Sequence, residues 1–110
     1  MKELTKIEEI LLLTIWRLKE EAYGVKIRRH ISRLTGKEFT YGNLYSALSQ
    51  LTKKRYVFKH EEESTKARKG WKRMYYSLSP AGLKALKNAC EMNEKIWQGI
   101  SVRAFKEEIK

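Results

Sequence analysis

Residues 40–51, TYGNLYSALSQL, decide the fold of this chain. The leucines in this stretch recur by steps of four and three, at Leu44, Leu48 and Leu51, which is the spacing of one face of an α-helix. Thr40 suits the position before the first turn, where its hydroxyl accepts a hydrogen bond from the backbone. The stretch therefore predicts a helix over residues 40–54 that buries its leucines and leaves the opposite, polar face to solvent.

Two further helices are predicted upstream. Thr5-Lys6-Ile7-Glu8 has the form of a capping box, so we expect a helix from about residue 5 to residue 20. Residues 10–18 are too apolar for a single buried stripe, which predicts contact with a second subunit as well as with the helix's own domain. A second helix of about a dozen residues follows Tyr23-Gly24 and ends at Gly36. Its apolar residues at helical spacing are Val25, Ile27, Ile31 and Leu34.

Downstream of residue 54 the pattern predicts a β-hairpin and a last helix. Residues 56–63 and 71–78 are rich in aromatic and β-branched side chains, and the hydrophilic residues 64–70 separate them. Ser79-Pro80 then supplies a helix cap followed by proline at the first helical position. We expect this helix to form the rest of the chain, residues 80–110.

Three helices followed by a hairpin with a basic tip are typical of a winged helix-turn-helix, in which the third helix enters the major groove of DNA. The expected fold class is mainly α with a small β-hairpin. Residues 1–79 are predicted to form the winged helix-turn-helix domain, and residues 80–110 a C-terminal dimerisation helix. We expect that last helix to pack on the first helix, about residues 5–20, of a partner subunit.

Composition narrows the function. The 110 residues include 24 Lys and Arg against 13 acidic residues, so the net charge is +11. Residues 22–78 hold 14 of these bases and only 4 of the acids, which favours a polyanionic partner, nucleic acid first and an anionic membrane surface second. Every acidic residue is Glu, which excludes Asp-based triads and Walker-type magnesium sites. No catalytic residue, metal ligand or cofactor is predicted.

The sequence also bears on location. The N-terminus lacks the basic region, apolar stretch and small-residue cleavage site of a signal peptide. The longest apolar stretch, residues 10–18, contains Thr14 and Arg17 and is about half the length that crosses a bilayer. Cys90 is the only cysteine, which excludes an intramolecular disulfide. We expect a cytoplasmic protein without a membrane anchor.

Three motifs carry a family resemblance. They are Tyr23-Gly24-Val25, Gly42-Asn43-Leu44-Tyr45, and the hairpin end Tyr75-Tyr76-Ser77-Leu78-Ser79-Pro80-Ala81-Gly82. Over roughly residues 4–86 the chain resembles the PadR family of transcriptional regulators, which implies a sequence-specific DNA-binding protein. Its short length resembles the compact branch that includes multidrug-responsive repressors, which implies a homodimer. Position 43 is Asn where the family commonly has Thr or Ser, and residues 68–71 stand where many members have a tighter Gly-Arg-rich run. The resemblance therefore does not predict which operator sequence this chain binds.

The polar face of the predicted third helix is the candidate DNA-reading surface. The amides of Asn43 and Gln50 suit adenine edges, and the hydroxyls of Tyr41 and Tyr45 suit phosphates. A plain solvated face is the alternative for the two amides, and a place in the core is the alternative for Tyr45. The candidate residues on this helix are Thr40, Tyr41, Asn43, Tyr45, Ser46, Gln50 and Lys53.

Basic residues near the hairpin tip are the candidate backbone contacts of the wing. They are Lys66, Arg68, Lys69, Lys72 and Arg73. Each phosphate contact releases counterions, so each steepens the log–log salt dependence of binding by about 0.9. A loop that only aids solubility is the alternative. One or two more phosphate contacts are expected from the bases of the second helix, Lys26, Arg28, Arg29 and Arg33.

The last helix carries a heptad-like seam, which predicts a two-chain interface. Its members are Leu83, Leu86, Cys90, Asn93, Trp97 and Ile100. Asn93 either fixes the register of this seam or is a chance polar position. Trp16 and Trp97 are the candidate ligand residues, because two copies of each at a dimer centre would line an aromatic slot for flat, cationic or phenolic molecules. Simple core packing is the alternative for both.

Together these features favour a homodimeric repressor that binds promoter DNA and is released by a small aromatic or phenolic ligand at the dimer interface. The alternative is a winged-helix module that binds protein, or an architectural module without sequence-specific readout. An enzyme is the third hypothesis. It ranks last because no nucleophile, base and orienting group occur together in the sequence.

Overall fold

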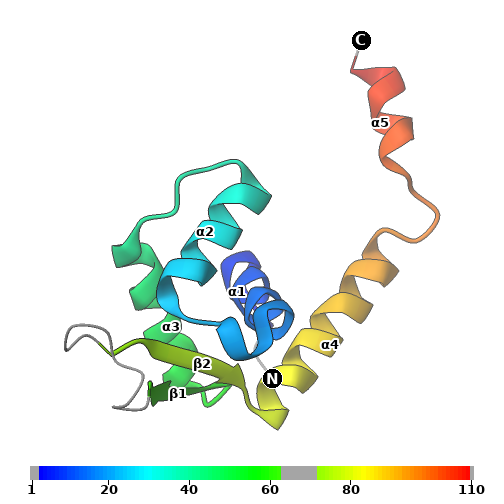
Figure 1. Ribbon diagram of the computed structural model, residues 1–110. Helices are drawn as coiled ribbons and strands as arrows, with labels where there is room; N and C mark the ends of the chain where they lie inside the picture. Colours follow the sequence, from blue (N-terminus) through cyan, green and yellow to red (C-terminus); the bar gives the residue numbers. More distant parts are fainter. Residues whose placement is uncertain (1–2, 63–71, 110) are drawn as a thin grey trace.

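A computed structural model of the chain describes residues 3–62 and 72–109. Its elements are α1 (Lys6–Leu18), the 3-10 turn η1 (Lys19–Glu21), α2 (Gly24–Thr35), α3 (Tyr41–Lys53), β1 (Val57–Glu61), β2 (Met74–Leu78), α4 (Pro80–Ile96) and α5 (Val102–Glu108). The fold is mainly helical with a small antiparallel sheet, as predicted. In Figure 1, α1, α2 and α3 form a body beside the sheet, and α4 leads away from it with α5 at its far end.

The core surrounds α1, which contacts α2, α3, α4 and β2. The leucines of α3 are fully buried, as the spacing predicted, and each contributes roughly 1.5–3 kcal/mol by leaving water. One cluster joins all three helices and the sheet: Leu11, Leu12, Ile15, Ala22, Ile27, Ile31, Leu44, Leu48, Leu51, Val57 and Tyr76.

The predicted helix caps are confirmed. The Thr5 hydroxyl accepts from the Glu8 N–H at 3.2 Å, and the Glu8 carboxylate accepts from the Thr5 N–H at 2.9 Å, which completes the capping box. Thr40 caps α3 by accepting from the Asn43 N–H at 3.1 Å. Gly36 ends α2 in the left-handed region at φ 69°, where glycine meets no steric penalty.

The predicted apolar face of α2 is only half right. Ile27 and Ile31 are buried, whereas Val25 and Leu34 are exposed. Val25 lies about 200° around the helix from Ile27, at 100° per residue, so the two side chains cannot face the same core. Leu34 belongs to the last turn of α2, directly before the Gly36 cap.

The hairpin is shorter than predicted and is attached to the helical body. The register pairs Val57 with Leu78 and Glu61 with Met74. On the other edge of β2, the Tyr76 N–H donates to the Ala22 carbonyl at 2.9 Å, and Tyr23 forms an isolated bridge to Tyr75. The loop between η1 and α2 therefore acts as a short third strand beside the wing.

The start of α4 is locked onto the end of α3. The Ser79 hydroxyl donates to the Arg55 carbonyl at 2.7 Å and accepts from the Gly82 N–H at 3.0 Å. The Ser79 N–H donates to the Tyr56 carbonyl at 3.0 Å. Gly82 lies so close to that carbonyl that a Cβ on it would stand 2.0 Å from the oxygen. The orientation of α4 is thus tied to the end of α3.

The C-terminal segment is two helices and not the single helix predicted for residues 80–110. α4 ends at the Trp97 C-cap, Gly99 takes a left-handed φ of 78°, and α5 begins after Ser101. Because glycine adopts this conformation at low cost, it ends the helix where an alanine would continue it.

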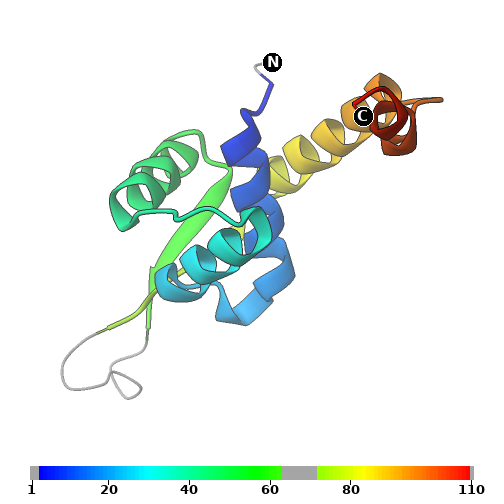
Figure 2. The ribbon, with the colours of Figure 1, turned by 90° about the horizontal axis from the view of Figure 1, so that it is seen from above.

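The chain is elongated. Its Cα radius of gyration is 16.5 Å, against about 13 Å for a compact domain of this length. Figure 2 shows α4 and α5 extending to one side of the body, which accounts for the extra length.

Candidate nucleic-acid interface

The face of α3 opposite its leucines is open to solvent. The exposed residues of α3 and its N-cap include all the candidates of the sequence analysis: Thr40, Tyr41, Asn43, Tyr45, Ser46, Gln50 and Lys53. Asn43, Ser46 and Gln50 follow one another at steps of three and four, so they share a stripe of the helix. The structure therefore brings Asn43, Ser46 and Gln50 together, whereas Tyr41 and Tyr45 lie to one side of this stripe, nearer the leucine face.

The two tyrosines of α3 form an aromatic step at its N-terminal end. The rings of Tyr41 and Tyr45 stack with centroids 6.2 Å apart and planes 17° from parallel. Tyr45 is 47% exposed, so it does not belong to the core. Its hydroxyl lies over the first residue of α2, because a Cβ on Gly24 would stand 2.4 Å from that oxygen. Tyr45 thus connects the two helices of the helix-turn-helix.

A basic depression lies beside this aromatic step. Arg28 places its guanidinium carbon 4.5 Å from the Tyr41 ring centre, a cation–π arrangement, and reaches Glu38 at 4.0 Å. The depression has a volume of about 560 Å³ and is lined by Val25, Arg28, Arg29, Ser32, Arg33, Gly36, Lys37, Glu38 and Tyr41. Four bases against one acid suit a phosphate group. The sequence indicated the bases of α2, but it did not show that Tyr41 of α3 would meet one of them.

Lys54, at the end of α3, is engaged away from this face. Its ammonium lies 2.5 Å from the Glu8 carboxylate, whose side chain is only 7% exposed. Burial raises the pKa of Glu8, but the hydrogen bonds from Lys54 and from the Thr5 backbone, together with the Lys54 charge, outweigh it and lower the pKa below its ordinary 4.5. The ion pair links the end of α3 to the start of α1.

The wing residues are placed only in part. Lys66, Arg68 and Lys69 lie outside the described residues. Lys72 forms a surface ion pair with Glu61 at 3.7 Å. Arg73 stacks on Tyr23, with its guanidinium carbon 4.2 Å from the ring centre, and a hydrogen bond to Tyr75 raises the pKa of Arg73.

The predicted seam of the last helix is not one continuous surface. Leu83, Cys90 and Trp97 are exposed, whereas Leu86 packs against the core of its own subunit. The half-buried Asn93 donates from Nδ2 to Glu9 Oε2 at 2.9 Å, so it joins α4 to α1 within the chain. Ile100 lies past the end of α4 because the helix breaks at Trp97.

Further apolar side chains of the C-terminal segment are exposed, and the sequence analysis did not identify them. They are Met92, Ile96, Val102, Phe105 and Ile109, and all are exposed on α4, on α5 or just beyond it. Phe105 meets the edge of Trp97 with ring centroids 6.0 Å apart, so this pair of rings joins α5 to the end of α4. Because the helix breaks at Gly99, these residues do not follow one continuous helical spacing, and the sequence pattern did not indicate them.

The two candidate ligand residues lie in different surroundings. Trp97 is half exposed and meets Phe105. Trp16 is 47% exposed and carries the Lys19 ammonium 3.6 Å from its ring centre. Trp16 lines a groove with the hairpin, and Trp97 is not among the residues of that groove.

Two kinds of feature are absent from the described residues. No helix in residues 3–62 and 72–109 is long and apolar enough to cross a membrane. Within the same ranges, no three His, Cys or Glu side chains are grouped as metal ligands.

Three helices, a two-stranded wing and an exposed polar third helix beside basic residues define a winged helix-turn-helix DNA-binding protein. The family model for the transcriptional regulator PadR-like family matches residues 12–88. The chain therefore belongs to the PadR-like family of transcriptional regulators, which are DNA-binding regulators and not enzymes.

Solved structures agree with this assignment. RosR from H. salinarum is 26% identical, with a TM-score of 0.69 over 98% of this chain and 90% of that one. A transcriptional regulator from Clostridium thermocellum is 27% identical, with a TM-score of 0.66 over 94% and 93%. A PadR-like transcription factor from Bacteroides fragilis is 26% identical, with a TM-score of 0.65 over 82% and 85%. Among curated proteins, the comparison found no match.

Proposed function

We propose that the protein is a homodimeric repressor that binds promoter DNA in the cytoplasm and reads it with α3. The observation that carries this proposal is the exposed polar stripe of α3 beside a depression lined by four basic residues. Asn43 and Gln50 present amides that pair with the N6 and N7 atoms of adenine, and Ser46 lies between them. The two amides read the DNA bases, whereas the Lys and Arg side chains around them supply affinity without sequence preference.

The phosphate contacts come from two sides of the reading helix. On one side, Arg28, Arg29 and Arg33 of α2 surround the depression next to Tyr41. On the other side, Lys72 and Arg73 are the described basic residues of the wing that would reach the neighbouring backbone. The pairing of Lys72 with Glu61 is exposed on both partners and worth at most about 1 kcal/mol, so a phosphate can replace the carboxylate.

The dimer forms through the apolar surface of α4 and α5. Ile96 is 62% exposed, and α5 is a seven-residue helix, too short to be stable in water without a surface to pack on. In the dimer, α4 and α5 of one subunit would pack against the same surface and α1 of the partner subunit. This arrangement would place the two α3 helices at half-sites about one helical turn apart. A small aromatic or phenolic molecule held by Trp16 and Trp97 at this interface would change the separation of the two reading helices and release the DNA.

The test is binding of the protein to its own upstream promoter fragment and to a scrambled duplex of equal length, at several salt concentrations. The variant Asn43→Ala/Gln50→Ala removes the two reading amides. The matched control Asn88→Ala/Gln98→Ala removes two exposed amides of the C-terminal region. We expect the reading variant to bind the promoter no better than the scrambled duplex, a loss of about 1–3 kcal/mol per amide, and the control to keep the wild-type preference.

Equal binding of wild type to both duplexes, unaffected by either variant, would refute sequence-specific reading and leave an architectural or protein-binding module. Repression itself is tested with a reporter driven by the same promoter. Expression of the protein should lower reporter output, and the reading variant should restore it.

A further inference from the structure

The start of α2, the wing and α3 meet at the Tyr23-Gly24 step. Tyr23 forms the isolated bridge to Tyr75 of β2. The Tyr45 hydroxyl of α3 lies over Gly24, where an added Cβ would stand 2.4 Å from its oxygen. A side chain at position 23 can therefore act on the wing and on α3 at once.

Two cations lie over the Tyr23 ring, one from the wing and one from α2. The guanidinium carbon of Arg73, at the base of the wing, lies 4.2 Å from the ring centre, and the Lys26 ammonium lies 5.9 Å from it. Lys26 also pairs with the exposed Glu21 at 2.6 Å, which offsets its charge. Arg73 is the closer of the two cations, so it gains most from the quadrupole of the ring.

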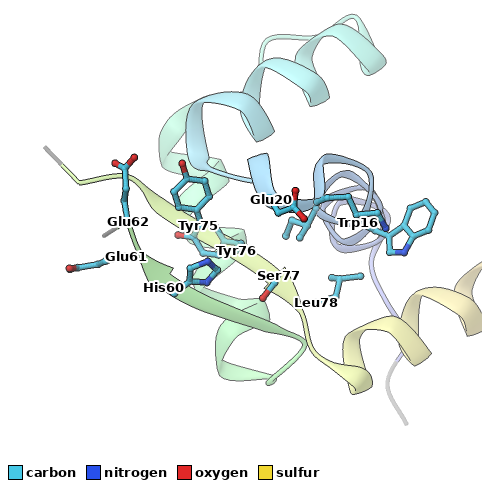
Figure 3. A pocket seen from close by; sticks show the side chains of 11 residues that line it. Trp16, Glu20, His60, Glu61, Glu62, Tyr75, Tyr76, Ser77 and Leu78 are labelled. Atoms are coloured by element: carbon cyan, nitrogen blue, oxygen red, sulfur yellow. The ribbon is translucent and has the colours of Figure 1, made fainter. Parts of the chain in front are cut away.

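Tyr75 holds the Arg73 guanidinium from a second direction. A hydrogen bond joins the two side chains, and the rings of Tyr75 and Tyr23 meet edge to face with centroids 5.5 Å apart. Tyr75 also stacks on His60 at 5.9 Å, and Figure 3 shows its ring directed from β2 toward α2. The Arg73 backbone N–H donates to the Glu62 carboxylate at 3.1 Å. Arg73 is therefore oriented before it meets any partner outside the chain.

This arrangement favours a phosphate of the DNA backbone as the further partner of Arg73. A guanidinium that rests on a ring uses its π surface there, and its remaining N–H groups form a fork that matches phosphate oxygens. Next to it, α2 begins without an acidic residue in its first turn, and the backbone N–H groups of a helix start favour an anion. The exposed Tyr45 of α3 adjoins the same place.

We propose that Tyr23 is a positioning residue for DNA binding, whose ring holds Arg73 so that the guanidinium binds one backbone phosphate between the wing and α2. Without the ring, Arg73 keeps its charge but must be ordered when it binds, which weakens the contact. The inference rests on the proposed DNA binding but not on sequence-specific reading or repression, because a phosphate contact forms on any duplex.

The test is a double-variant cycle of Tyr23→Leu, Arg73→Ala and the two combined. Binding to the scrambled duplex is titrated at several salt concentrations, so operator recognition does not enter. Tyr23→Phe keeps the ring and is the rescuing variant. The matched control Phe58→Leu removes an exposed ring of the same sheet, one with no cation over its face in the described part of the chain. If Tyr23→Leu loses helical content by circular dichroism, Tyr23→Met replaces it in the cycle.

We expect Arg73→Ala to weaken binding about tenfold and to lower the log–log salt slope by about 0.9. Tyr23→Leu should weaken binding about fivefold, whereas Tyr23→Phe and Phe58→Leu should stay within about twofold of wild type. The double variant should bind as weakly as Arg73→Ala alone, because Tyr23 acts through Arg73.

An additive double variant, about fiftyfold weaker than wild type, would show that Tyr23 acts without Arg73 and would overturn the proposal. An unchanged salt slope in Arg73→Ala, or wild-type affinity in Tyr23→Leu, would overturn it as well. Failure of the repressor proposal gives a different result, since wild type would then bind the promoter and the scrambled duplex equally while the cycle keeps its expected pattern.

Discussion

Gly82→Ala should destabilise the protein, although the same change usually stabilises a helix. Gly82 lies in the first turn of α4, where alanine is favoured over glycine by about 1 kcal/mol. An added Cβ would stand 2.0 Å from the Tyr56 carbonyl oxygen and 2.9 Å from its carbon, both of them backbone atoms. Since real contacts to Cβ are essentially never shorter than 3.0 Å, α4 must move by about 1 Å or more.

That movement acts on the contacts that tie α4 to α3. It weakens the hydrogen bonds from Ser79 to the Tyr56 and Arg55 carbonyls, at 3.0 and 2.7 Å, each worth about 1 kcal/mol. Overpacking itself costs about 1–3 kcal/mol. After the gain in helix propensity, we expect a net loss of about 2–4 kcal/mol, which lowers Tm by roughly 15 °C.

The assay is urea and thermal unfolding followed by circular dichroism, at one fixed protein concentration because a dimer couples stability to concentration. Gly42→Ala in α3 is the matched control, since the nearest atom to its Cβ would be the Thr40 hydroxyl oxygen at 4.0 Å. That substitution should leave stability unchanged or raise it by up to about 1 kcal/mol. A Gly82→Ala protein as stable as wild type would refute the reasoning that this close approach fixes α4 to the end of α3.

Three further outcomes are expected. Glu8→Gln should lower the free energy of unfolding by about 2 kcal/mol at pH 7. Because the folded pKa of Glu8 lies below 4.5, this stabilisation is complete above that pH and disappears as the pH falls through the folded pKa, so urea unfolding of the two proteins should converge in acid. Arg28→Ala should reduce the log–log salt slope of DNA binding by about 0.9 without changing the preferred sequence, and an unchanged slope would show that Arg28 touches no phosphate. Ile96→Asp should give a monomer with unchanged helical content in sedimentation and circular dichroism, because it buries a charge at the proposed dimer surface; a persistent dimer would place the interface elsewhere.

Much of the fold could be predicted because its signals are local. A capping box spans four residues, a left-handed glycine needs only its own conformation, and the leucine face of α3 repeats within one helix. These patterns operate through bonds and contacts inside one element, so no knowledge of the partner element is needed. The same local periodicity placed Asn43 and Gln50 on the exposed face of α3.

The errors arose where one element meets another. Val25 was grouped with Ile27 and Ile31 on one apolar face, but it lies about 200° around α2 from Ile27 and points away from the core. The last helix was extended to residue 110 because apolar residues continue past Gly99, yet the left-handed glycine ends the pattern. Leu86 and Asn93 were placed in an intermolecular seam, whereas both make contacts within the subunit.

The sequence by itself determined the class of protein: three capped helices, a hairpin, an excess of positive charge in the middle of the chain and a polar face on the third helix. Only the tertiary structure decided which polar and charged groups meet. Lys54 finds Glu8 across 46 residues, and Asn93 finds Glu9 across 84. Partners so far apart in the chain leave no periodic trace in it, because their pairing depends on how α1 packs against α3 and α4 and not on the spacing within any one helix.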